Sequence, residues 1–195
     1  YEQNTDQEMY RRVMELTKEV VPQYYPKIAD QLLHPYSIGR RRVDDATAPI
    51  VMDCQAGINT PVTRKGSVIG SHLDNCNELF ALLLYLKDPN DFSTGGDLEL
   101  QRWRHKSLRF QYGKQRIPKF LTQNTNVVEY GKNKAVFFLN TPVSIHSVSP
   151  REVTPYSRRL VNIIAETYPS IEGGLFLKES IAKEIRFISK IYQKI

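Results

Sequence analysis

The residues with the clearest chemical potential lie in the segment GSVIGSHLDN (66–75), in which one residue separates His72 from Asp74. In an extended strand, residues i and i+2 point to the same side, so this imidazole and this carboxylate would project together. Two such groups on one backbone segment supply part of a metal site. The pair alone more often forms a surface salt bridge or a helix cap, so a metal site requires a third ligand from elsewhere in the chain.

The third ligand has to come from the other three histidines. His34 precedes a proline, where helix is disfavoured, and is predicted to be a loop or boundary residue. His105 lies in a basic segment that we expect to be a loop. His146 follows a strong strand pattern and lies near the start of another β segment, so it is the preferred third ligand. Two imidazoles and one carboxylate form the facial triad of non-haem Fe(II) oxygenases, which leaves three positions open on the metal.

A pair of arginines, Arg158 and Arg159, begins the segment SRRLVNIIA shortly after His146. A dicarboxylate cosubstrate bound to iron would need a cation nearby, and an interior arginine can hold a carboxylate through two parallel hydrogen bonds. In a strand, Arg158 shares one face with Leu160 and Asn162. Arg159 lies on the other face. The pattern leaves both arginines as candidates, and exposed charges on an edge strand are the plainer alternative.

The N-terminal part of the chain is predicted to be helical. A first amphipathic helix is expected over about 6–25, with prolines 22 and 26 ending it. Its apolar face is formed by Met9, Val13, Leu16 and Val20. A second short helix is expected over 28–33, followed by an irregular stretch over 35–47.

From residue 49 the pattern changes to short β segments separated by turn signals. Strands are expected over 49–54, 68–74, 79–86, 97–102, 126–130, 134–139, 144–148 and 157–167, with a loop or hairpin over 57–65. The run 79–86 is almost entirely apolar, as expected of a central strand buried on both faces. About eight strands flanked by helices predict a mostly β protein with an antiparallel double-stranded β-helix (jelly roll), whose mouth can hold a ligand. We expect one domain, with N-terminal helices in 1–47, a core in 48–168 and a C-terminal helix in 175–195.

Four segments in this order resemble the 2-oxoglutarate- and Fe(II)-dependent dioxygenases, in their prolyl-4-hydroxylase-like branch. GSVIGSHLDN is similar to the family's His-x-Asp segment, and ALLLYLKDPNDFSTGGDLEL to its YLN…GG-L segment. GKNKAVFF resembles the turn and strand before the distal histidine. HSVSP followed by SRRLVNIIA resembles the segment with the distal histidine and the strand that an arginine begins. The resemblance covers about 49–167 and leaves out the terminal helices.

The resemblance implies roles for individual residues. The implied Fe(II) ligands are His72, Asp74 and His146. Arg158, with Arg159 as the alternative, would pair with the distal carboxylate of 2-oxoglutarate, and the Tyr85 hydroxyl would reach the same carboxylate. Weaker, pocket-lining roles fall to Leu83, Val148 and Asn162. The implied reaction consumes O2 and 2-oxoglutarate, hydroxylates an unactivated C–H bond and releases succinate and CO2.

The sequence leaves the substrate open between a prolyl or other protein side chain and a small metabolite, including an anionic one. The net charge is +6, and the stretch 101–119 holds seven lysines and arginines with no acidic residue. A solvated basic loop is the plainer interpretation, and attraction of an acidic substrate or partner is the functional one. Nucleic acid is not the expected substrate, because relatives that repair it carry a second arginine further along the final strand, and 160–165 holds none.

Two alternatives to a 2-oxoglutarate enzyme remain. A cupin-type metal enzyme would use the same ligands without needing Arg158, and a non-catalytic jelly-roll binding module would bind no iron. The longest apolar run, 79–86, is far shorter than the ~20 residues of a membrane helix. The N-terminus is too polar for a signal peptide, and Cys54 and Cys76 form no metal-binding spacing, so we expect reduced thiols in a cytoplasmic protein. No oligomeric state is predicted.

Overall fold

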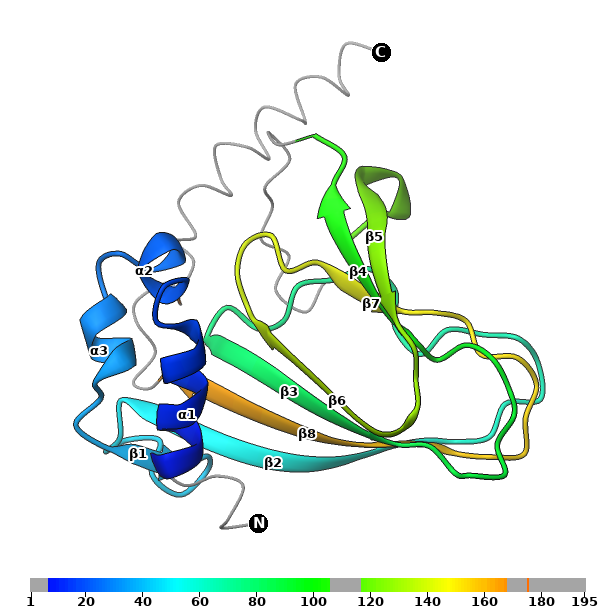
Figure 1. Ribbon diagram of the computed structural model, residues 1–195, viewed down its shortest axis with the longest axis horizontal. Helices are drawn as coiled ribbons and strands as arrows, with labels where there is room; N and C mark the ends of the chain where they lie inside the picture. The colour runs from blue at the N-terminus through cyan, green and yellow to red at the C-terminus, as the bar shows by residue number, and fades with distance from the viewer. Residues whose placement is uncertain (1–6, 106–116, 168–174, 176–195) are drawn as a thin grey trace.

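The structure, a computed structural model, describes residues 7–105, 117–167 and 175, and it is a mostly β, jelly-roll-like fold with helices at one side (Figure 1). A five-stranded sheet has the order β1-β2-β8-β3-β6, and a three-stranded sheet has the order β5-β4-β7. The strands are β1 (Ile38–Arg40), β2 (Ile50–Asn59), β3 (Glu78–Leu86), β4 (Leu98–Trp103), β5 (Thr122–Val128), β6 (Lys132–Leu139), β7 (His146–Val148) and β8 (Arg158–Thr167). All neighbours pair antiparallel except β1 with β2.

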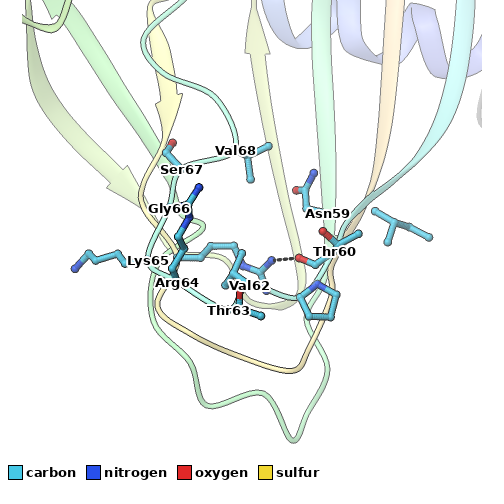
Figure 2. Close-up of a pocket in the computed structure, with 12 residues that line it drawn as sticks. Asn59, Thr60, Val62, Thr63, Arg64, Lys65, Gly66, Ser67 and Val68 are labelled. Atoms are coloured by element: carbon cyan, nitrogen blue, oxygen red, sulfur yellow. Dashed lines mark hydrogen bonds between the residues drawn. The ribbon is translucent and has the colours of Figure 1, made fainter.

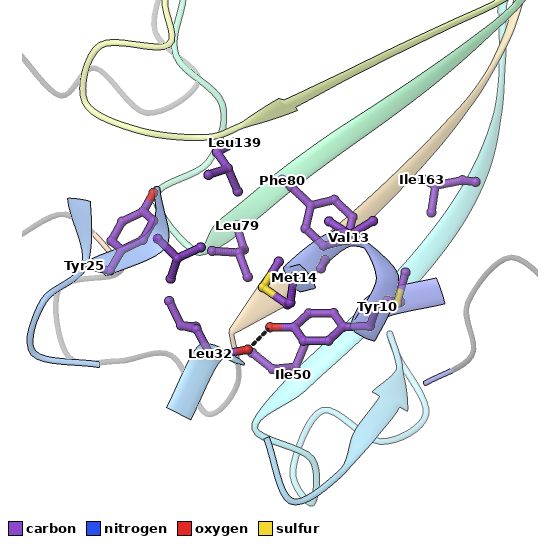
Figure 3. Packing of buried hydrophobic residues seen from close by; sticks show 13 residues of the cluster. Tyr10, Val13, Met14, Tyr25, Leu32, Ile50, Leu79, Phe80, Leu139 and Ile163 are labelled. Carbon is purple, nitrogen blue, oxygen red and sulfur yellow. Dashed lines mark hydrogen bonds between the residues drawn. The ribbon is translucent and has the colours of Figure 1, made fainter. Parts of the chain in front are cut away.

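Three short helices, α1 (Gln7–Thr17), α2 (Val21–Tyr24) and α3 (Ala29–Leu33), cover one face of the large sheet. Figure 3 shows Tyr10, Val13 and Met14 of α1 turned toward Leu79, Phe80 and Ile163 of the sheet. The Tyr10 hydroxyl donates a hydrogen bond to the Leu32 carbonyl, at 2.8 Å, which fixes α1 against α3. Burial of these large side chains contributes about 1.5–3 kcal/mol each.

The first helix differs from its prediction in length and in buried face. It ends at Thr17, and Pro22 lies in the first turn of α2, where the missing N–H of a proline costs nothing. Leu16, expected on the apolar face, is 83% exposed, while Tyr10 and Met14 are buried. The larger apolar area of the tyrosine and methionine decides which face of α1 packs on the sheet.

Alternation along the central strands divides their side chains between the helices and the space between the two sheets. On β3, Phe80 and Leu82 pack in the cluster under the helices. Leu83 and Tyr85 face the opposite way, into the interior between the sheets. On the neighbouring β8, Arg158 and Asn162 face that interior too. The apolar run at 79–86 is therefore a strand buried on both faces, as its composition predicts.

The pairing of β2 with β8 continues beyond both strands and carries the chain from the large sheet to the small one. Regular pairing ends at Asn59 opposite Arg158. Isolated bridges then join 62 with 154, 66 with 151, and finally His72 with His146. In Figure 1 these two segments run side by side around the end of the molecule opposite the helices. The fold therefore places two histidines that are distant in sequence directly opposite each other.

The segment 68–74 is not a strand, contrary to the prediction. Its backbone makes the single bridge at His72 and is otherwise irregular. Gly70 interrupts this stretch, and a glycine within a strand disfavours a regular ladder. Two smaller differences are β1, which lies in the stretch expected to be irregular, and the fifth strand, which covers Thr122–Val128 rather than 126–130.

Other predictions lie partly or wholly outside the described residues. The expected C-terminal helix is one of these, as is most of the basic stretch 101–119. The division of the chain into helical and core regions and the cytoplasmic location stay predictions. Cys54 and Cys76 are free thiols. Among the described helices, none has the length and apolar character needed to cross a membrane.

Two consecutive glycines allow their turn to pack closely against the distant segment around residues 150–158. Gly95 and Gly96 have φ angles of 82° and 79°, in the left-handed region that favours glycine. A Cβ added to Gly95 would lie 1.9 Å from the Pro150 carbonyl oxygen. At Gly96 it would meet the Arg151 and Arg158 side chains at 3.2 Å. The glycine pair therefore permits the close contact that brings Arg158 against this turn.

Replacement of Gly95 by alanine should lower the free energy of unfolding by at least about 3 kcal/mol, because left-handed backbone strain adds to a clash with backbone atoms. Chemical denaturation measures this change. Gly70→Ala is the matched control, since a Cβ there meets nothing within 4 Å and should have little effect. Equal stability of the two variants would contradict the close approach of Gly95 to Pro150.

Candidate metal centre

The three predicted ligands come together in the folded chain. The Nε2 atoms of His72 and His146 lie 3.5 and 3.6 Å from the same oxygen of Asp74. One potential ligand atom from each residue can be chosen so that all three lie within 4.8 Å of one another. Within 7–105 and 117–167, this is the one group of three or more histidine, cysteine or acidic side chains with such geometry. Both histidines are buried and Asp74 is partly buried.

The backbone explains why the two imidazoles face one point. His72 and His146 exchange both backbone hydrogen bonds, at 2.9 and 3.1 Å, so their side chains leave neighbouring positions of one ladder. Their ring centroids are 4.3 Å apart. Asp74 follows His72 by two residues in the same segment and brings one carboxylate oxygen close to the Nε2 atoms of both rings.

Hydrogen bonds to backbone carbonyls set the orientation of each ring. His72 Nδ1 lies 2.8 Å from the Gly70 carbonyl oxygen, and His146 Nδ1 lies 2.9 Å from that of Ser144. A carbonyl can only accept, so each Nδ1 carries the hydrogen and donates it. In the neutral tautomer each Nε2 lone pair then points to the centre of the group, as a metal ligand requires.

The electrostatics of the metal-free group are those of a tightly paired acid and base. Burial alone would raise the pKa of Asp74, but hydrogen bonds and charge from His146 and His72 outweigh it and lower that pKa. Burial alone would lower the pKa of His146, whereas the Asp74 carboxylate raises it above its ordinary value of 6.5. In the metal-free protein, a proton on His146 thus supplies the positive charge that a bound metal ion would supply beside Asp74.

Affinity for a divalent metal should consequently fall on acidification, starting above pH 6.5. The metal binds the neutral imidazole, so it must displace a proton as the pH drops through the raised pKa of His146. Calorimetric titration of the metal-free protein with Co(II) across a pH series measures this change. Affinity that stays constant as the pH falls past 6.5 would contradict the involvement of His146.

The group opens onto a cavity of about 260 Å³ between the two sheets. Its lining includes the three candidate ligands and every other predicted cavity residue, namely Leu83, Tyr85, Val148, Arg158 and Asn162. Phe138 of β6 also lines it, with its ring centroid 4.8 Å from that of His146. Arg159 lies on the outer face of β8 and is exposed. The geometry thus separates the two arginines that the sequence leaves as alternatives.

Arg158 is 3% exposed and is held on several sides. Its Nε donates to the Gly96 carbonyl at 2.8 Å, and its Nη1 donates to the Asn59 side chain at 3.2 Å. The guanidinium carbon lies 5.0 and 5.1 Å from the ring centroids of Tyr85 and Tyr130. No carboxylate of the described residues pairs with it in an ion pair. Arg158 is therefore a buried cation without an ion-pair partner in the described part of the chain, although the carboxylates of Asp74 and Glu78 also line the cavity.

Tyr85 adds a second polar group to the same cavity. It is fully buried, and its hydroxyl oxygen makes no well-aligned hydrogen bond among the described residues, although the Arg158 side chain lies close enough to interact with it. Burial raises its pKa, although the nearby Arg158 charge acts in the opposite direction. Asn162 likewise has a buried amide oxygen without a described partner. A buried, unpaired polar atom is costly, so these two atoms indicate places where a ligand can complete the hydrogen bonding.

Sequence reasoning missed several residues of the cavity. Asn59 and Tyr130 reach Arg158 from β2 and from the residues after β5. The Tyr130 hydroxyl also accepts a hydrogen bond from the Arg159 backbone at 2.9 Å. Asn59 could have been found only from the register that sets it opposite Arg158. Phe138 lies on the same face of its strand as Val136, an alternation that is visible in the sequence AVFFL.

Comparison with known proteins gives only distant structural likenesses. No protein-family model matches the chain, and a search of curated proteins finds no match. A prolyl 4-hydroxylase from Phytophthora capsici matches over 84% of this chain and 48% of that chain, with 17% identity and a TM-score of 0.39. The chain thus spans about half the length of that hydroxylase.

Two further likenesses are weaker in TM-score. A disulfide-linked pilus protein of Bacillus endospore appendages matches over 64% of this chain and 93% of that chain, with 11% identity and a TM-score of 0.28. IMPa from Pseudomonas aeruginosa matches over 71% of this chain and 15% of that chain, with 15% identity and a TM-score of 0.33. The fold and the site define a jelly-roll-like β protein with a His-Asp-His group suited to a metal ion.

Proposed function

We propose that the protein is a 2-oxoglutarate- and Fe(II)-dependent dioxygenase that hydroxylates an unactivated C–H bond. One observation carries this proposal: the His-Asp-His group and the buried Arg158 line the same cavity. A metal site alone would fit many chemistries. A metal site that shares a small cavity with a buried arginine in no ion pair with the described residues fits a cosubstrate that is both a chelator and an anion.

The three side chains suit iron by their chemistry. Two neutral imidazoles and one carboxylate are the donor set of the facial triad, and both Nε2 lone pairs are already oriented toward one point. His72, Asp74 and His146 would hold the metal from one side. When bound, Fe(II) supplies the activation of O2, so that one oxygen atom enters the C–H bond and the other enters succinate as 2-oxoglutarate loses CO2.

The remaining cavity residues would bind and orient 2-oxoglutarate. Arg158 would pair with the carboxylate distant from the metal, and the Tyr85 hydroxyl would donate a hydrogen bond to it. Such an anion would pair with the buried guanidinium and give the Tyr85 hydroxyl a well-aligned acceptor. Leu83, Val148 and Phe138 would exclude water from the space between this carboxylate and the metal.

Tyr85→Phe separates this role from a purely structural one. The hydroxyl makes no well-aligned hydrogen bond with the described residues of the folded protein and interacts there with Arg158, so its removal should change the free energy of unfolding by no more than about 1 kcal/mol. Affinity for 2-oxoglutarate should fall roughly tenfold, as expected for loss of a hydrogen bond to a charged group. Thermal unfolding and calorimetric titration measure the two quantities. Loss of stability with unchanged affinity would contradict the proposed contact.

Turnover tests the proposal as a whole. The protein with Fe(II), ascorbate, O2 and 2-oxoglutarate should form succinate slowly even without its substrate, and 1H NMR follows that product. Asp74→Ala should form none. If the protein binds metal but forms no succinate, the cupin-type alternative is favoured. If it binds no metal, the non-catalytic binding module is favoured.

A further inference from the structure

A second and larger concavity, of about 520 Å³, lies beside the metal cavity (Figure 2). It is formed by the segment 58–68, which comprises the last two residues of β2 and the chain that follows them, together with the Arg151 side chain. Asn59 and Val68 line both this groove and the metal cavity. In Figure 2 these two residues lie at the end nearer the strands, and Thr63 and Arg64 lie at the opposite end. A molecule that reaches out of the metal cavity at this point would enter the groove.

All the charged side chains that line the groove are positive. Three cations line it, Arg64, Lys65 and Arg151, and no aspartate or glutamate is among the lining residues. Lys65 forms an ion pair with Glu152, at 2.5 Å, but both side chains are largely solvent-exposed, and such a pair contributes little. Arg64 is exposed and forms no ion pair with a carboxylate in the described ranges.

Arg151 places part of this positive charge below the surface, because the residue is buried, with 2% exposure. Its two terminal nitrogens donate to the carbonyl oxygens of Thr60, at 3.0 Å, and Tyr156, at 2.7 Å. Figure 2 shows the first of these bonds. No carboxylate within 7–105 or 117–167 forms an ion pair with it.

Two buried arginines therefore lie close together. Arg151 and Arg158 both pack against the same side of Gly96, within 3.2 Å of the place where a Cβ would be. The Arg151 charge lowers the pKa of Arg158, after the larger effect of burial. One anion at Arg158 would balance the charge of that arginine. The charge of Arg151, which lines the groove, would still have no anionic partner among the described residues. Buried charges are costly unless they are paired, so the groove favours a second anion.

The groove also has apolar walls. Ile58 is 67% exposed and Val68 is 40% exposed, and both line it. An exposed apolar surface beside a cationic end suits a ligand with a carbon framework and a charged terminus. The volume is within the range of sites that hold small molecules.

We propose that this groove binds a carboxylate or phosphate group at the non-reacting end of the substrate, which is a small anionic molecule. The reactive C–H bond would lie in the metal cavity, the carbon framework would pass Asn59 and Val68, and the anionic group would lie among Arg64, Lys65 and Arg151. The assignment of this anion as substrate rests on the proposed oxygenase function, whereas anion binding in the groove does not.

The test uses metal-free, 15N-labelled protein, so that it does not depend on iron chemistry. Pyrophosphate and tricarballylate, a tricarboxylate, are titrated separately, and the amide signals of residues 62–68 are followed by NMR. At least one probe should give saturable shifts there, and the tighter probe identifies the anionic group. Binding should weaken with rising ionic strength. Arg64→Ala should raise the dissociation constant by roughly two- to fivefold. Arg40→Ala, which removes an exposed arginine of β1 away from the groove, should leave it unchanged.

Three outcomes would overturn the proposal. The first is the absence of saturable shifts with both probes. The second is equal weakening by Arg64→Ala and Arg40→Ala. The third is binding that Arg158→Gln abolishes and Arg64→Ala leaves intact, because the anion would then lie in the metal cavity. Groove binding in a protein that takes up no metal would instead refute the oxygenase function and keep the anion site, so the two failures are distinguishable.

Discussion

Asp74→Ala is expected to abolish metal binding and turnover while the fold remains intact. Asp74 supplies the one carboxylate of the group, and the same oxygen of it lies 3.5 and 3.6 Å from the Nε2 atoms of the two imidazoles. Without it, two histidines alone would face the metal. Affinity for Fe(II) or Co(II) should fall by more than about a hundredfold, beyond the effect of losing a residue that only supports a ligand.

Calorimetric titration measures the affinity, and circular dichroism and thermal unfolding check the fold. His72→Ala and His146→Ala should show the same loss. His105→Ala is the matched control, because His105 is exposed and outside the group, so it should bind metal as the unmodified chain does. Normal iron binding with full activity in Asp74→Ala would show that the metal site has been placed on the wrong residues.

Arg158→Ala is expected to weaken 2-oxoglutarate binding far more than Arg159→Ala does. The Arg158 guanidinium is buried in the cavity beside Tyr85, whereas Arg159 is exposed on the other face of β8. Loss of one partner of a buried, hydrogen-bonded charge pair costs about 2–5 kcal/mol. The dissociation constant for 2-oxoglutarate should therefore rise by roughly thirtyfold or more. For Arg159→Ala it should stay close to the unmodified value.

Anaerobic titration of the metal-loaded variants with 2-oxoglutarate gives this ranking directly. Arg158 also donates to Gly96 and Asn59, so Arg158→Gln is measured beside the alanine variant to retain part of the packing and hydrogen bonding. The reverse ranking would move the cosubstrate contact to Arg159, and equal, small effects would favour an enzyme that does not use 2-oxoglutarate.

Local patterns in the sequence predicted much of the cavity. The alternation along 158–162 correctly places Arg158 and Asn162 on one face, because the period of a strand depends only on the backbone. The apolar run at 79–86 correctly predicts a strand buried on both faces, with Leu83 and Tyr85 turned to the cavity. These residues needed no knowledge of their partners.

Long-range contacts could not be predicted in this way. The bridge between His72 and His146 arises from the extended pairing of two distant segments, not from a regular strand at 68–74. The close approach of Gly95 to Pro150 likewise depends on the path of both segments. Arginine side chains are usually exposed, so the burial of Arg151 could not be predicted from its residue type and is seen only in the fold. The local sequence shows how side chains alternate along a strand, but it does not show which distant segments pack against that strand.

The most direct test of the central claim is an anaerobic absorption measurement. Fe(II) and then 2-oxoglutarate are added to metal-free protein, and the visible spectrum is followed for the weak charge-transfer band of iron chelated by a 2-oxo acid. We expect the band in the unmodified protein, a much weaker one at the same 2-oxoglutarate concentration in Arg158→Ala, and none in His72→Ala. Iron bound by the unmodified protein with no band at saturating 2-oxoglutarate would contradict the account.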